Sequence, residues 1–85
     1  MLSPNPSVVS RRVADEIVLV HLDSNRIYSL NRTAARLWEL VALGTTVQEA
    51  EAQLSTEYDI APAELSREIE ACVTKLLAEE LLVQR

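Results

Sequence analysis

Residues 30–40, Leu-Asn-Arg-Thr-Ala-Ala-Arg-Leu-Trp-Glu-Leu, constrain the fold of this chain more than any other segment. Asn31 is a favoured helix N-cap, because its side-chain oxygen can accept a hydrogen bond from a backbone N–H that the first turn leaves without a partner. Apolar side chains then recur at helical spacing, at Ala34, Leu37, Trp38 and Val41. The run therefore predicts a strand end, a cap and an amphipathic helix in direct succession.

Extended segments precede this helix. Residues 16–22 are dense in β-branched side chains, residues 23–25 (Asp-Ser-Asn) supply turn chemistry, and residues 26–30 complete a hairpin. Residues 8–13 alternate weakly and predict an edge strand. Together these segments predict a three-stranded antiparallel sheet.

The hairpin register follows from cross-strand pairing. We expect Leu22 opposite Ile27, which pairs Val20 with Ser29. One face then carries Val18, Leu22 and Ile27, and the other carries Ile17, Leu19, His21, Tyr28 and Leu30. Because both faces are largely apolar, an apolar surface should remain after helices cover one face, and such a surface usually meets a partner or a terminal segment.

Two more helices should follow the first, which runs from Arg32 to Leu43 and stops at Gly44, the only glycine in the chain. Residues 46–49 (Thr-Val-Gln-Glu) read as a capping box that opens a second helix, and Pro62 suits the first turn of a third. The third helix carries a wide apolar arc of Leu65, Ile69, Cys72, Val73, Leu76 and Leu77.

This order of elements predicts an α+β, winged helix-turn-helix-like fold, with a three-stranded antiparallel sheet followed by three helices. Residues 1–6 carry two prolines and small polar side chains, and they predict a flexible N-terminus. Residues 7–85 should form a single domain.

Composition excludes several function classes. The formal net charge of −5 disfavours nucleic acid, because affinity for phosphate backbones comes largely from Lys and Arg. One cysteine cannot form an internal disulfide, and neither a signal peptide nor a membrane span is evident. We therefore expect a cytoplasmic protein that binds no membrane.

No residue pattern predicts catalysis. His21, the only histidine, lies among apolar residues and is expected to be a partly buried strand residue rather than a ligand or switch. Cys72 lies in an apolar arc without a base on its helix, so a core thiol is the better interpretation than a nucleophile. Trp38 is expected in the core rather than at a binding surface. With no metal-ligand cluster, phosphate loop or acid–base pair, we expect no cofactor and no enzymatic activity.

The chain resembles the PqqD-like family, the RiPP recognition elements, over about residues 13–83. The matching residues are 28–31 (Tyr-Ser-Leu-Asn), Thr33-Ala34, 37–40 (Leu-Trp-Glu-Leu), 46–49, 57–60 (Glu-Tyr-Asp-Ile), Leu76-Leu77 and Leu81-Leu82. Family members commonly have glycine where this chain has Glu80, and often an aromatic residue at Cys72.

The resemblance implies a domain that binds the leader segment of a ribosomally made precursor peptide by β-strand addition, most similar to the discrete recognition proteins of lasso-peptide pathways. It also implies a separate cysteine leader peptidase as partner. The implied peptide-binding residues are Arg26, Ile27, Tyr28, Ser29, Leu30, Leu65, Glu68, Cys72, Lys75 and Leu76. The alternative is a winged-helix transcription regulator or a protein-interaction module, which the acidic balance of residues 62–80 disfavours as a DNA reader.

Overall fold

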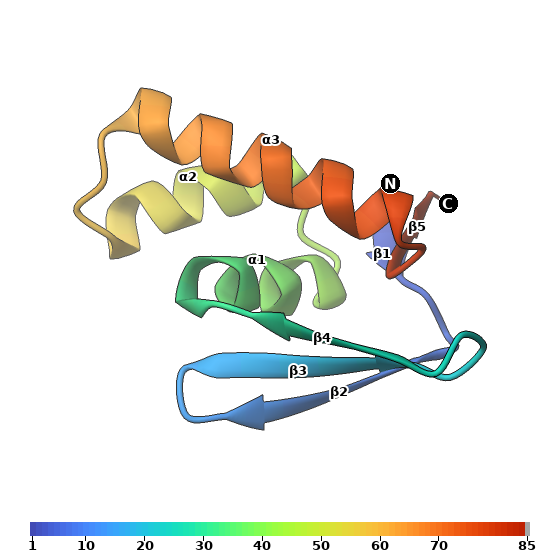
Figure 1. The fold of residues 1–85 in the computed structure, drawn as a ribbon. Coiled ribbons are helices and arrows are strands. Elements are labelled where there is room, and N and C mark those ends of the chain that lie inside the picture. Colours follow the sequence, from blue (N-terminus) through green and yellow to red (C-terminus); the bar gives the residue numbers. More distant parts are fainter. Residues whose placement is uncertain (85) are drawn as a thin grey trace.

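Strands and helices form two small sheets and one group of helices in the computed structural model, which describes residues 1–84. In chain order they are β1 (Leu2–Pro4), β2 (Val8–Val13), β3 (Glu16–His21), β4 (Arg26–Leu30), α1 (Arg32–Ala42), α2 (Val47–Glu57), α3 (Pro62–Ala78) and β5 (Leu82–Gln84). The helices lie together on one side of the antiparallel sheet β2-β3-β4, with α1 nearest to it (Figure 1). The α+β class and the three-stranded sheet are confirmed, although strands both precede and follow the helices.

The three-stranded sheet buries one of its faces. Ile17, Leu19 and His21 alternate along β3 toward the helices and are at most 4% exposed. Leu30 of β4 joins them in the buried layer. The predicted division of the hairpin side chains between the two faces is therefore correct.

The predicted hairpin register is wrong by two residues. Val20 lies opposite Ile27 rather than Ser29, because pairing ends at His21 and Arg26 and leaves residues 22–25 in the turn. Asn25 has a φ of +57°, a left-handed conformation that asparagine tolerates better than most residues. Since side chains alternate with a period of two, a shift of two residues keeps each side chain on its predicted face.

Local signals set the helix ends. The Asn31 side chain accepts a hydrogen bond from the Ala34 N–H at 3.0 Å, and α1 ends before Gly44, whose φ is +94°. Thr46 and Glu49 form both halves of the predicted capping box of α2. These features confirm the expected start and end of the first helix to within one residue and the expected start of the second.

The two ends of the chain form a sheet that the sequence does not predict. Leu2 lies opposite Gln84 in the antiparallel pair β1–β5. Asn5 extends this attachment, since its backbone N–H donates to the Leu81 carbonyl at 3.0 Å and its side-chain amide donates to the Glu80 carbonyl at 2.8 Å. The sequence predicts a flexible start for residues 1–6 and gives no sign of β1, because this pairing joins segments too far apart in the chain to leave a local pattern.

Leucine fills most of the core between the sheet and the helices. Trp38 is 4% exposed, which confirms its predicted core position. The other buried apolar residues are Ile17, Leu19, Leu30, Ala35, Leu37, Leu40, Val41, Ala50, Leu54, Leu65, Ile69, Leu76, Leu81 and Leu82.

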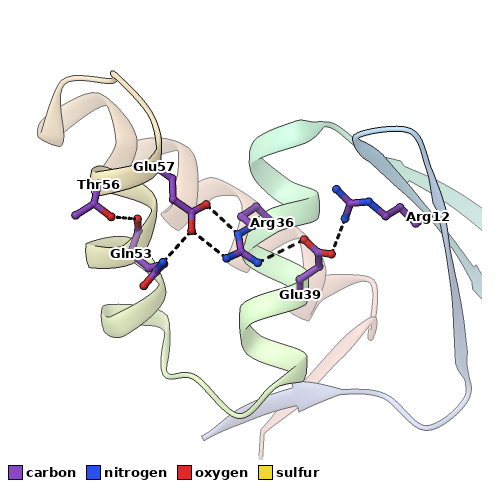
Figure 2. A network of polar contacts seen from close by, with 6 residues as sticks. All are labelled: Arg12, Arg36, Glu39, Gln53, Thr56 and Glu57. Atoms are coloured by element: carbon purple, nitrogen blue, oxygen red, sulfur yellow. Dashed lines mark hydrogen bonds and ion pairs between the residues drawn. The ribbon is translucent and has the colours of Figure 1, made fainter.

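A polar network ties β2 to α1 and α2 across the surface of the molecule (Figure 2). Glu39 of α1 pairs with Arg12 of β2 and with Arg36, and Arg36 donates two hydrogen bonds to Glu57 of α2 at 2.9 Å. The hydrogen bonds from Arg36 and then from Gln53 lower the pKa of Glu57 to about 2. The network therefore favours the ionised form of Glu57 in the folded protein.

Candidate functional site

An apolar groove of about 410 Å³ lies between β4 and the C-terminal half of α3. Leu30, Leu76 and Leu81 are buried, and Tyr28 is half-buried among the lining residues. The full lining is Ile27, Tyr28, Ser29, Leu30, Asn31, Ala34, Cys72, Lys75, Leu76 and Leu81. Because Lys75 is the only charged residue of this set, the groove suits apolar side chains.

The backbone of β4 has an open edge beside this groove. The Leu22 N–H donates to the Ser7 carbonyl, so even-numbered residues of β3 direct their backbone groups toward β2. Odd-numbered residues of β3 therefore bond to Arg26, Tyr28 and Leu30, which they face in the β3–β4 register. The N–H and C=O groups of Ile27 and Ser29 consequently point to the open edge, where an extended segment could pair with them.

Tyr28 links β4 to the end of α3. Its hydroxyl donates a hydrogen bond to Glu79 Oε2 at 2.7 Å, and Arg26 Nη1 lies 3.7 Å from the same oxygen. The hydrogen bond to Glu79 is the main cause that raises the pKa of Tyr28, with desolvation as a second cause. Tyr28 therefore remains a neutral phenol at neutral pH and helps to hold the two walls of the groove together.

Cys72 and Lys75 lie on the α3 wall. Cys72 is half-buried, and burial raises the pKa of its thiol while the nearby Lys75 charge opposes that shift. A thiol with a raised pKa is mostly protonated at neutral pH, and a protonated thiol is a poor nucleophile. The side chain is therefore suited to an apolar contact, although it lies in the groove wall rather than deep in the core.

The structure brings together seven of the ten residues that the resemblance implies: Ile27, Tyr28, Ser29, Leu30, Cys72, Lys75 and Leu76. The other three lie outside the groove. Leu65 is fully buried in the core, Glu68 is exposed elsewhere on α3, and Arg26 lines a neighbouring hollow of about 280 Å³. Three lining residues were not predicted, namely Asn31, Ala34 and Leu81.

His21 is buried, as expected for a residue inside the sheet, and its Nδ1 has no hydrogen-bond partner among residues 1–84. Within this same part of the chain, no group of His, Cys, Asp and Glu side chains could hold a metal ion. The described helices include none that is long and apolar enough to cross a membrane.

An open edge strand beside an apolar groove defines a small α+β domain that can accept an extended segment of another chain. The family model described as coenzyme PQQ synthesis protein D (PqqD) matches residues 16–82, and the chain belongs to this family. No curated protein matches the sequence.

Two solved structures share the fold over nearly the whole chain. One is described as TbiB1 in complex with the TbiA(beta) leader peptide, with 26% identity, a TM-score of 0.90, and coverage of 98% of this chain and 96% of that one. The other is a lasso peptide synthetase B1 complexed with the leader peptide, with 23% identity, a TM-score of 0.86 and coverage of 98% of each chain. Both described structures therefore hold a leader peptide on a domain of this fold.

Proposed function

We propose that this protein binds the leader segment of a ribosomally synthesised precursor peptide in lasso-peptide biosynthesis. The open edge of β4 beside the apolar groove carries this proposal, because the same edge offers backbone partners and an apolar surface. Membership of the PqqD family and the likeness to TbiB1 in complex with a leader peptide support it. The peptide adds to β4 as a fourth strand and places alternate side chains in the groove.

The groove is large enough for the domain to bind a peptide with useful affinity, and the proposed function requires binding alone. Two or three buried peptide side chains contribute about 1.5–3 kcal/mol each. Backbone ladder bonds add to this, and ordering of the peptide opposes it, so a Kd between micromolar and nanomolar follows.

The first test compares a labelled leader peptide with a labelled DNA duplex in titrations at about 150 mM salt, where exposed phosphate contacts are partly screened. We expect saturation with the peptide alone. Duplex binding without peptide binding would favour the alternative regulator, for which the predicted winged helix-turn-helix arrangement would supply the reading helix. The acidic residues of α3, Glu64, Glu68 and Glu70, oppose that outcome.

A backbone test addresses strand addition directly. Ser29→Pro removes an N–H that points to the open edge, so the domain should stay folded while leader affinity falls at least about tenfold. Ser29→Ala keeps the N–H and should bind like the parent. A folded Ser29→Pro variant with parental affinity would place the peptide elsewhere.

A side-chain test addresses the groove. Cys72→Trp should fill the space between β4 and α3 and weaken leader binding, while Thr74→Trp puts the same bulk on an exposed position of α3 outside the groove. Thermal unfolding separates a blocked groove from an unfolded domain. Equal leader affinity for both variants would contradict the assignment of the groove.

The bound leader is then presented to a separate cysteine leader peptidase in the cytoplasm, and the adaptor itself acts by binding. If so, adding the domain should increase the rate of leader removal by that peptidase. The Ser29→Pro variant should not increase the rate of leader removal at concentrations where it leaves the leader unbound.

A further inference from the structure

A polar hollow of about 280 Å³ adjoins the groove at Tyr28, which lines both. It lies between the turn that follows β3 and the C-terminal end of α3, which Figure 1 shows on the same side of the molecule. The ionisable residues of its lining are His21, Asp23, Arg26, Tyr28, Glu79 and Glu80. A peptide that follows the edge of β4 past Ser29 and Ile27 therefore reaches this hollow next.

The charges of the hollow are mainly negative. Glu79 has its own partners, because Oε2 accepts a hydrogen bond from the Tyr28 hydroxyl and lies 3.7 Å from Arg26 Nη1. Asp23 and Glu80 make no ion pair among residues 1–84. The hollow is therefore left with the negative charges of these two carboxylates, and it suits a cation.

His21 is the buried member of the lining. It is 4% exposed, and its Nδ1 has no hydrogen-bond partner among residues 1–84. A buried polar atom without a partner lowers stability, so an apolar side chain of similar size would suit a purely structural position better. A neutral imidazole has one ring nitrogen that accepts a hydrogen bond, and an ammonium or guanidinium group would supply the donor.

Glu80 reaches the hollow at a cost to the backbone. Its φ of +57° is a left-handed conformation that glycine adopts more easily than glutamate does. Members of the PqqD-like family commonly have glycine here, which has no side chain to offer. Backbone strain of this kind is concentrated at functional sites, and here it places a carboxylate where glycine would leave none.

We propose that the hollow binds a lysine or arginine side chain of the leader peptide, as a subsite that follows the apolar groove. This inference rests on the proposed function. The basic leader residue lies opposite Arg26 or at the next position along the added strand, because His21 and Arg26 are paired in the sheet and the new strand continues that row. Asp23, Glu80 and His21 attract the basic side chain, whereas Arg26 repels it.

The experiment measures leader affinity by fluorescence anisotropy with two synthetic peptides. One is the leader of the precursor encoded beside this domain, and the other replaces its basic residues at the two proposed positions by glutamine. The domain variant Asp23→Asn/Glu80→Gln removes both unpaired carboxylates. Its control, Asp15→Asn/Glu64→Gln, removes the same charge at exposed positions at the opposite ends of β3 and α3.

We expect each removed ion pair to weaken binding up to about fivefold, so the parent should bind the glutamine peptide about tenfold more weakly than the natural leader. Asp23→Asn/Glu80→Gln should lose about tenfold toward the natural leader and little more toward the glutamine peptide, which identifies the two groups as partners. The control double variant should bind both peptides like the parent.

Two further variants change the hollow in different ways. Arg26→Gln should bind the natural leader about threefold more tightly, while Arg67→Gln, at an exposed position of α3 outside the hollow, should not. His21→Leu should bind it about threefold more weakly without a lower Tm, because the substitution removes the unpartnered Nδ1. A lower Tm with parental leader affinity would make His21 a structural residue and contradict its place in the subsite.

Equal affinity of the parent for the two peptides would overturn the subsite, as would a natural leader without lysine or arginine at the two positions. Equal losses in Asp23→Asn/Glu80→Gln and its control would also overturn it, because they would indicate an effect of net charge alone. In each of these cases the parent still binds the leader, so the proposed function stands. Failure of the parent to bind the leader at all would count against the proposed function itself.

Discussion

Asn5 holds the N-terminal segment to the turn between α3 and β5, and Asn5→Ala measures the strength of that attachment. The side chain makes two hydrogen bonds, from Nδ2 to the Glu80 carbonyl at 2.8 Å and from the Ser7 N–H to Oδ1 at 2.9 Å. Each bond contributes about 1 kcal/mol, and in the variant water can partly replace the exposed bond to the Glu80 carbonyl. The free energy of unfolding should therefore fall by about 1–2 kcal/mol. An unfolding entropy of about 0.18 kcal/mol per degree for a chain of this length converts this loss to a Tm lower by about 6–11 °C.

Thermal unfolding of the parent and Asn5→Ala checks this magnitude, with a denaturant m-value that should not change because the same surface is buried. The amide of Val83 in β5 should exchange faster in the variant, while that of Leu37 in α1 should change less. Gln48→Ala is the control, since that exposed amide makes no side-chain hydrogen bond among residues 1–84. An Asn5→Ala variant that melts with the parent would refute a stabilising role for the β1–β5 pair.

Three further changes test other parts of the structure. Trp38→Ala should lower the free energy of unfolding by about 3–5 kcal/mol through the cavity it leaves, as measured in urea; lost leader binding with unchanged stability would contradict its core role. Glu80→Gly should raise Tm by about 3–6 °C, because Glu80 has a φ of +57° and glycine adopts this conformation without a Cβ clash. Ala14→Gly, at the same φ, should act in the same direction, and a lower Tm for both would refute the argument. The pKa of Glu57, about 2 when folded against an ordinary 4.5, means that its ionised form stabilises the fold above pH 4.5 and that this contribution is lost as the pH falls toward 2. The free energy of unfolding of Glu57→Gln should therefore be lower than that of the parent at pH 7, by no more than about 1 kcal/mol because the ion pair lies at the surface, and the two should be equal near pH 2. A carboxyl NMR titration midpoint near 4.5 for Glu57 in the parent would contradict this.

Local chemistry explains which parts of the fold could be predicted from the sequence. Asn31, Gly44 and the Thr46 capping box each act within four residues of their own position, so their helix ends could be located from the chain alone. The hairpin register depends on which turn residues adopt a left-handed conformation, and the turn contains more than one candidate. The β1–β5 pair depends on contacts between opposite ends of the chain, which no window of sequence contains.

The candidate site shows a similar division. The resemblance to the PqqD-like family implied residues 27–30 on one strand and Cys72, Lys75 and Leu76 on α3, and the structure places these seven residues around one groove. Leu65 lies outside the groove because the apolar arc of α3 faces the groove in its C-terminal half and the helical core in its N-terminal half. Leu81 reaches the groove only through the turn after α3, so its position required the tertiary structure. Asn31 and Ala34 complete the lining. The small side chain of Ala34, close in sequence to the end of β4, was the signal from which this part of the groove could have been predicted.

The pairing of β1 with β5 also determines how this domain can be joined to other proteins. Leu2 and Gln84 are direct partners, and Figure 1 shows the N and C labels side by side. A linker attached at either end therefore starts from almost the same point, so fusion to either terminus of an enzyme would place the groove at a similar distance from it. The same proximity would allow the whole domain to be inserted into a surface loop of a host protein with short connections.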